Sequence, residues 1–146
     1  MSVGRICSRE VDTAEREESV QVAAQRMHAR KVGTLVVVDA EGIPIGMLTD
    51  RDLAVRVVAA GCDASQTTVG DVMTPRPATA FVDSAIEDAL RIMRTALCRR
   101  IPVVDRGGRL TGLVSLDDVL ELLSEEFQSI GRVIHDESPQ SLASAL

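Results

Sequence analysis

Apolar residues recur along the chain with two alternating periods, and the same alternation occurs in both halves. Helical spacing of apolar residues predicts a helix around residues 20–27, and the β-branched run TLVVVD predicts a strand after it. A glycine turn (AEG), a second strand (IPIGML) and a helix through Val58 complete the unit. In the second half, a helix around residues 86–93 precedes RIPVVD, RGG, RLTGLV and a helix that continues past Leu123.

The two halves are related by an internal repeat. A shift of 66 positions aligns residues 3–57 with residues 69–123 without a gap, and 12 of the 55 pairs are identical. A period of this length indicates two copies of one supersecondary unit. Because a unit of about 60 residues is marginal for an independent core, we expect the copies to pack around a pseudo-twofold axis.

The pattern therefore predicts an α+β fold made of two pseudo-twofold-related repeats. Each repeat has the order helix, strand, strand, helix, with a short extended piece before it. The expected boundaries are a first repeat at 1–61, a linker at 62–68, a second repeat at 69–127, and a C-terminal helical extension and tail at 128–146. Phe127, Ile130 and Ile134 continue an apolar helical stripe, which predicts either a fraying terminal helix or a partner contact.

Composition narrows the classes of function. A net charge of -6 and a pI near 4.9 disfavour a nucleic-acid partner, which needs a basic face. No apolar run reaches the roughly 18 residues of a membrane helix, and the charged N-terminus does not resemble a signal peptide, so we expect a cytoplasmic protein. Cys7, Cys62 and Cys98 have neither a CxxC nor a zinc spacing, which predicts free thiols.

One motif occurs once in each copy, since the segment GMLTDRDL recurs as GLVSLDDV. Thr49 with Asp52, and Ser115 with Asp118, fit the capping box of a helix start, which requires no ligand. The same motif also suits a ligand, because the N–H groups of a helix start attract phosphate. A carboxylate close by can accept the hydroxyls of a ribose. The residues alone leave both interpretations open.

Two such units resemble a tandem pair of CBS domains (cystathionine β-synthase domains), also called a Bateman module. The segments LVVVDAEGIPIGMLTDRDL and IPVVDRGGRLTGLVSLDDV carry most of the resemblance, which extends from Val3 to about Phe127. Members of this family form a flat body with two clefts that often bind AMP, ADP, ATP or S-adenosylmethionine. The resemblance implies a regulatory homodimer that binds an adenosine ligand and acts on an effector protein.

The resemblance also implies that each cleft joins the helix start of one copy to the residues that begin the first long strand of the other. The first cleft would combine Thr49, Arg51 and Asp52 with Ala78, Arg100, Ile101 and Pro102, with Arg99 close by. The second would combine Ser115 and Asp118 with Val11, Thr34 and Leu35. Because the arginines of the first cleft can offset the charge of a phosphate, we predict that it is the principal nucleotide site.

Two other functions follow from the same residues. The chain can be a dimerisation or protein-interaction module whose clefts have no physiological ligand and whose aspartates only cap helices. An enzyme is the third class, but the sequence contains no recognisable nucleophile–base pair, metal-ligand set or Cys–His pair. We therefore predict a protein without catalytic activity and without a metal or catalytic cofactor.

Overall fold

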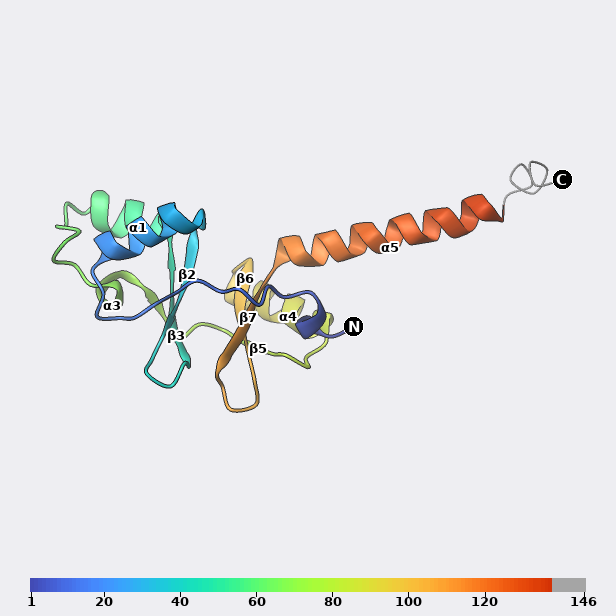
Figure 1. Cartoon of the computed structure of the whole chain (residues 1–146), viewed down its shortest axis with the longest axis horizontal. Helices are drawn as coiled ribbons and strands as arrows, with labels where there is room; N and C mark the ends of the chain where they lie inside the picture. The colour runs from blue at the N-terminus through green and yellow to red at the C-terminus, as the bar shows by residue number, and fades with distance from the viewer. Residues whose placement is uncertain (138–146) are drawn as a thin grey trace.

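The computed structural model describes residues 1–137 and consists of two α+β units that lie side by side (Figure 1). The first sheet has the order β1-β2-β3-β4 and the second has the order β5-β6-β7. The strands are β1 (Thr13–Ala14), β2 (Thr34–Val38), β3 (Pro44–Thr49), β4 (Thr74–Pro75), β5 (Ala80–Phe81), β6 (Arg100–Val104) and β7 (Leu110–Ser115). The predicted α+β fold with two repeats is confirmed, and residues 138–146 of the predicted tail lie outside the described residues.

The helices are α1 (Val20–Arg30), α2 (Asp50–Leu53), α3 (Val69–Val72), α4 (Ile86–Ala96) and α5 (Leu116–Asp136), with a 3-10 turn η1 (Val3–Arg5) and a π-helix η2 (Ala54–Val58). The helices before and after each hairpin follow the predicted order, whereas the short helices η1 and α3 at the opening of each copy were not predicted. Within residues 1–137, no helix has both the length and the apolar character needed to cross a membrane.

Each unit is built around one antiparallel hairpin, β2–β3 or β6–β7, with a short parallel strand added at its edge. The two hairpin turns have the same construction. In the first, the Asp39 carboxylate accepts hydrogen bonds from the backbone of Glu41 and Ile43. Gly42 adopts φ +80°, a left-handed conformation that glycine reaches without steric cost. Asp105 and Gly108 repeat this arrangement in the second copy.

The opening segment of each copy packs into the core of the other. Val3 and Cys7 belong to the cluster around Ile101 and Val114, whereas Val69 and Val72 belong to the cluster of the first unit. Backbone hydrogen bonds hold both crossings, from Val3 N–H to the Ser84 carbonyl (2.8 Å) and from Val69 N–H to the Glu18 carbonyl (2.8 Å). The two units are therefore interlocked.

One helix differs from its prediction. The sequence predicted a single α-helix through Val58, but α2 ends at Leu53 and Ala54–Val58 forms a π-helix. The Ala59 N–H donates to the Ala54 carbonyl five residues back, at 2.9 Å. Val57 is buried in the first core and the chain reverses at Gly61. These tertiary constraints are not contained in a 3.6-residue period.

Candidate functional site

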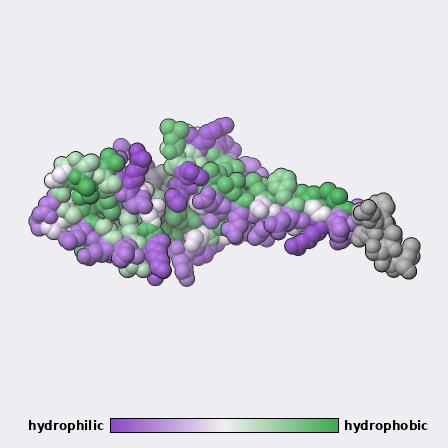
Figure 2. Space-filling model, turned by 90° about the horizontal axis from the view of Figure 1, so that it is seen from above, coloured by the Kyte–Doolittle hydropathy of each residue, from purple (hydrophilic) through white to green (hydrophobic). Residues whose placement is uncertain are grey.

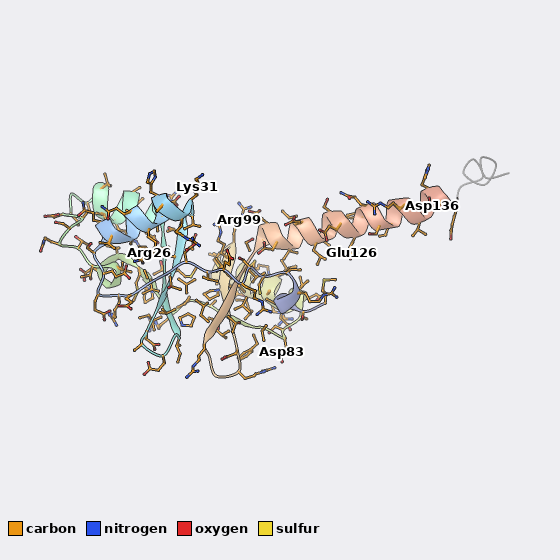
Figure 3. All side chains as sticks on the ribbon, viewed as in Figure 1. Arg26, Lys31, Asp83, Arg99, Glu126 and Asp136 are labelled. Atoms are coloured by element: carbon orange, nitrogen blue, oxygen red, sulfur yellow. The ribbon has the colours of Figure 1, made fainter. Side chains whose placement is uncertain are left out.

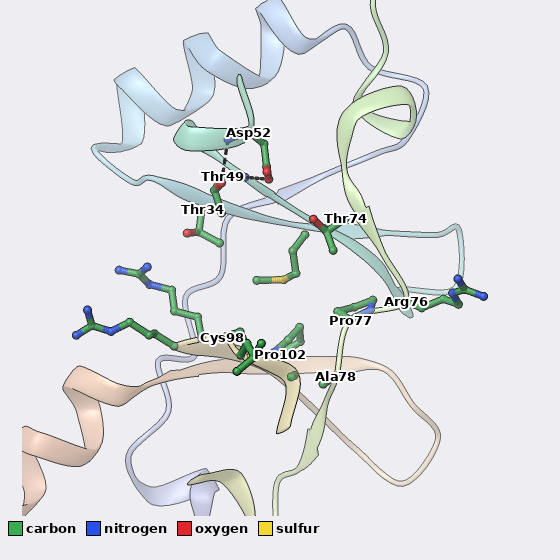
Figure 4. A pocket seen from close by; sticks show the side chains of 14 residues that line it. Thr34, Thr49, Asp52, Thr74, Arg76, Pro77, Ala78, Cys98 and Pro102 are labelled. Carbon is green, nitrogen blue, oxygen red and sulfur yellow. Dashed lines mark hydrogen bonds between the residues drawn. The ribbon is translucent and has the colours of Figure 1, made fainter. Parts of the chain in front are cut away.

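A cavity of about 390 Å³ opens between the two units, at the start of α2 (Figure 4). Thr34, Thr49, Asp52 and Thr74 lie on one side, and Pro77, Ala78, Cys98 and Pro102 lie on the other. Met47, Arg76, Ala96, Leu97, Arg99 and Arg100 complete the lining. This volume lies within the range of small-molecule sites, which is about 300–1,000 Å³.

The helix start on the first side is a complete capping box. The Asp52 N–H donates to the Thr49 hydroxyl (3.1 Å), and the Thr49 N–H donates to Oδ2 of Asp52 (2.9 Å). The second carboxylate oxygen of Asp52, Oδ1, has the Arg56 guanidinium at 3.8 Å, a long contact. The capping role that the sequence suggested is thus confirmed, and it leaves Oδ1 of Asp52 and the Thr49 hydroxyl proton able to bind a ligand.

The opposite side of the cavity is formed where the chain enters β6. α4 ends at Ala96, its C-cap residue Leu97 adopts φ +53°, and Cys98 follows directly. Burial raises the pKa of the Cys98 thiol, so this group remains neutral at physiological pH. Leu97, Cys98 and Pro102 give this side a largely apolar surface.

The charge of the cavity is mainly positive. Arg76, Arg99 and Arg100 line it, and Asp52 is the one acidic residue among the lining residues. Arg99 lies at the junction of the two units (Figure 3), and its guanidinium is 3.7 Å from the Asp117 carboxylate. Both side chains are 71% exposed, so this contact is weak. Within residues 1–137, Arg76 and Arg100 make no ion pair.

Most of the residues predicted for the first cleft meet in this cavity. The structure brings together Thr49, Asp52, Ala78, Arg99, Arg100 and Pro102. Arg51 is exposed and does not line the cavity, and Ile101 is 1% exposed within the second core. Thr34 was predicted for the second cleft but lines this one, because the β2–β3 register places it directly opposite Thr49.

The residues predicted for the second cleft do not share one of the described cavities. Ser115 lines a hollow of about 120 Å³, and Asp118 lines a different hollow of about 180 Å³ at the base of α5. Leu35 is fully buried, and Val11 lines neither hollow. The Ser115–Asp118 capping box is nevertheless complete, with contacts of 2.7 and 3.1 Å.

In the first unit, an ion pair occupies the positions that correspond to two small residues of the second unit that line the cavity. The 66-residue shift relates Asp12 to Ala78 and Arg30 to Ala96, and both alanines line the cavity. The Arg30 Nε lies 2.8 Å from the Asp12 carboxylate, and this hydrogen bond raises the pKa of Arg30. Two small side chains in one copy are thus replaced by a bonded pair in the other.

Sequence reasoning missed several lining residues, including Met47, Thr74, Arg76, Leu97 and Cys98. Arg76 stands between two prolines and adopts φ +51°, a backbone state that is uncommon for residues other than glycine. Its N–H donates to the Ile45 carbonyl at 3.1 Å, which fixes the turn beside the cavity. The sequence signal for this residue was the Pro-Arg-Pro triplet between two strands.

Comparison with known proteins agrees with the fold and the repeat. The sequence pattern of the CBS-domain family matches the chain twice, at residues 3–59 and 69–125. The chain belongs to the CBS-domain family. Its two copies form the tandem pair known as a Bateman module, as the sequence predicted.

Two relatives of this CBS pair differ in how much of their length the match covers. The CBS domain-containing protein YhcV of Bacillus subtilis is 37% identical over 118 residues, which cover 81% of this chain and 82% of YhcV. Protein MK0525 of Methanopyrus kandleri is 32% identical over 122 residues, which cover 84% of this chain but 62% of MK0525. The CBS pair therefore spans less than two thirds of that archaeal relative.

A solved structure has the same arrangement of the pair. The CBS domain pair of protein MJ0100, in complex with 5′-methylthioadenosine and S-adenosyl-L-methionine, superimposes with a TM-score of 0.76. The two chains are 26% identical, and the match covers 86% of this chain and 98% of that one.

Proposed function

We propose that this CBS pair is a non-catalytic regulatory sensor that binds one adenosine ligand in the cavity between Asp52 and Pro102. The cavity that joins the helix start of one copy to the arginines of the other carries this proposal. The adenosine ligands of the MJ0100 pair support the class of ligand, which includes AMP, ADP, ATP and S-adenosylmethionine.

Each part of such a ligand has a chemically suitable partner. Oδ1 of Asp52 can accept from the ribose hydroxyls, while the capping box holds its other oxygen. Arg100 can balance a phosphate, and it lacks a competing carboxylate within residues 1–137. The Arg76 side chain points away from the other lining residues (Figure 4). Leu97 and Pro102 offer an aliphatic surface for the adenine ring.

The function of such a sensor requires a second state. A ligand shifts a conformational equilibrium only by its difference in affinity for the two states. Because both interlocked units line the cavity, a ligand bound there directly changes which relative packing of the two units is more stable. We propose that a homodimer transmits this change to an effector protein.

Calorimetric titration of the purified chain with AMP, ATP and S-adenosylmethionine tests the proposal. We expect at least one of the three to bind with a stoichiometry of one per chain and a Kd below about 1 mM, equivalent to about 4 kcal/mol of binding free energy. Heats equal to dilution for all three ligands would leave only the alternative, a protein-interaction module without a small-molecule ligand.

The Asp12–Arg30 pair gives a further prediction about stoichiometry. Replacing both residues with alanine reproduces Ala78 and Ala96 of the second copy and removes the two charged side chains from the predicted second cleft. We expect titration with uncharged 5′-methylthioadenosine to show a second, weaker site in this double variant.

The matched control for that experiment removes a comparable ion pair elsewhere. Asp88 and Arg91 form a 2.7 Å pair on the exposed face of α4, away from both clefts. Their replacement by alanine is expected to leave the stoichiometry at one. A second site in the native chain would show that the Asp12–Arg30 pair does not block ligand entry.

A further inference from the structure

The last helix carries an apolar face that no part of the described chain covers. In α5, Val119 is buried, and the helix then extends away from both sheets (Figure 1). Glu126 and Asp136 lie along its free part (Figure 3). The exposed fractions on this face are 54% for Leu120, 47% for Leu123, 72% for Phe127, 54% for Ile130 and 67% for Ile134, and the neighbouring Val133 is 57% exposed. Figure 2 shows apolar residues along one side of this helix and hydrophilic residues along the other.

These five residues, Leu120, Leu123, Phe127, Ile130 and Ile134, are called here the α5 seam. Their spacing indicates which kind of surface can pack against them. They follow one another at alternating intervals of three and four residues. Strict alternation of this kind gives a period of 3.5 residues, which is the pattern of a seam between two helices. A helix that covers a globular core has a wider apolar stripe.

The charge of α5 argues against an anionic membrane surface as the occupant and favours another helix. The polar side of α5 carries Glu121, Glu125 and Glu126, whereas helices that bind anionic lipid present lysines and arginines. A second copy supplies a seam with the same spacing, and a twofold axis makes the two surfaces complementary by construction.

Charge also selects the relative direction of the two helices. Five of the six carboxylates of α5 precede Phe127, and its one arginine, Arg132, follows it. A parallel pair would place the two acidic halves side by side. An antiparallel pair places each acidic half beside the half that contains Arg132, and it also opposes the two helix dipoles.

We propose that two copies of this chain associate through an antiparallel pairing of their α5 seams. In the register centred on Glu125, Leu120 lies opposite Ile130 of the partner subunit, and Leu123 lies opposite Phe127 of the partner subunit. This pairing is independent of ligand binding in the cavity between Asp52 and Pro102, since none of the seam residues lines that cavity.

The oligomeric state of the full chain tests whether a second copy covers the α5 seam. Sedimentation velocity of the native chain at about 10 µM is expected to give a dimer, and Phe127→Glu is expected to weaken association by about 100-fold and give a monomer. Phe127 is 72% exposed, so this variant should keep the native circular dichroism spectrum and melting temperature. Val58→Glu, which changes a 77% exposed residue outside α5, is the matched control and should stay dimeric. A monomeric native chain, or a dimeric Phe127→Glu chain, would overturn the proposal.

Disulfide crosslinking tests the direction of the helices, in a Cys62→Ser background because Cys62 is exposed. Leu120 and Ile130 are ten residues apart, which separates equivalent positions in an antiparallel pair by about 15 Å. A disulfide needs Cα atoms within about 7 Å. Mixed Leu120→Cys and Ile130→Cys chains should therefore crosslink on oxidation, whereas Leu120→Cys alone should not exceed the background chain. Efficient crosslinking of Leu120→Cys with itself would show a parallel pair and contradict the proposed direction.

Discussion

Replacing Gly112 with alanine is expected to lower the melting temperature of the protein by about 10 °C, or about 2–3 kcal/mol of unfolding free energy. A Cβ atom at this position would lie 2.8 Å from Sγ of Cys7 and 2.9 Å from the backbone oxygen of Ser8. Ser8 cannot easily retreat, because it exchanges two 2.9 Å backbone hydrogen bonds with Leu113. The added methyl group therefore separates the opening segment from the second sheet.

Gly131→Ala is the control for this stability measurement. Gly131 lies inside α5, and a Cβ atom there would meet nothing within 4 Å. Because alanine favours a helix by about 0.5–1 kcal/mol over glycine, thermal unfolding followed by circular dichroism should show an unchanged or higher melting temperature. An equal loss of stability in both variants would mean that close packing at Gly112 is not the cause.

The second large effect concerns ligand affinity. Asp52→Ala is expected to weaken binding of the best adenosine ligand by at least about tenfold, or 1.4 kcal/mol, because it removes the free carboxylate oxygen inside the cavity. Asp118→Ala removes the same capping box at the other helix start but changes no residue that lines this cavity. Each substitution should reduce stability by about 1 kcal/mol.

The comparison of the two aspartates separates capping from binding, because both variants lose a cap and only one loses a proposed ligand contact. Calorimetric titration at one temperature, with both variants at least 95% folded as judged by circular dichroism, is the appropriate measurement. A larger loss of affinity in Asp118→Ala than in Asp52→Ala would reverse our choice of cleft.

Much of the fold could be predicted because the same pattern of helix, strand and turn signals occurs in both halves of the sequence. The spacing around residues 20–27 and 86–93, and the turns at Gly42 and Gly108, reappear as helices and hairpins where expected. These features depend on local periodicity and turn chemistry, which one sequence contains. The resemblance to CBS domains then supplied the idea that two copies share each cleft.

What the sequence could not supply depends on contacts between distant segments. No local pattern shows that Val3 joins the second core, or that Val69 joins the first. Thr34 was predicted for the second cleft because the strand entries were assigned without the β2–β3 register that pairs it with Thr49. The Asp12–Arg30 pair also became visible only once the fold had brought its members together.

Crystallisation of the native chain with the tightest of AMP, ATP and S-adenosylmethionine tests the central claim most directly. We expect difference density for one ligand per chain between the two units, with the ribose within hydrogen-bond distance of Oδ1 of Asp52 and any phosphate beside Arg100. Density located instead beside Asp118 and the Asp12–Arg30 pair, with the cavity at Asp52 filled only by water, would contradict it.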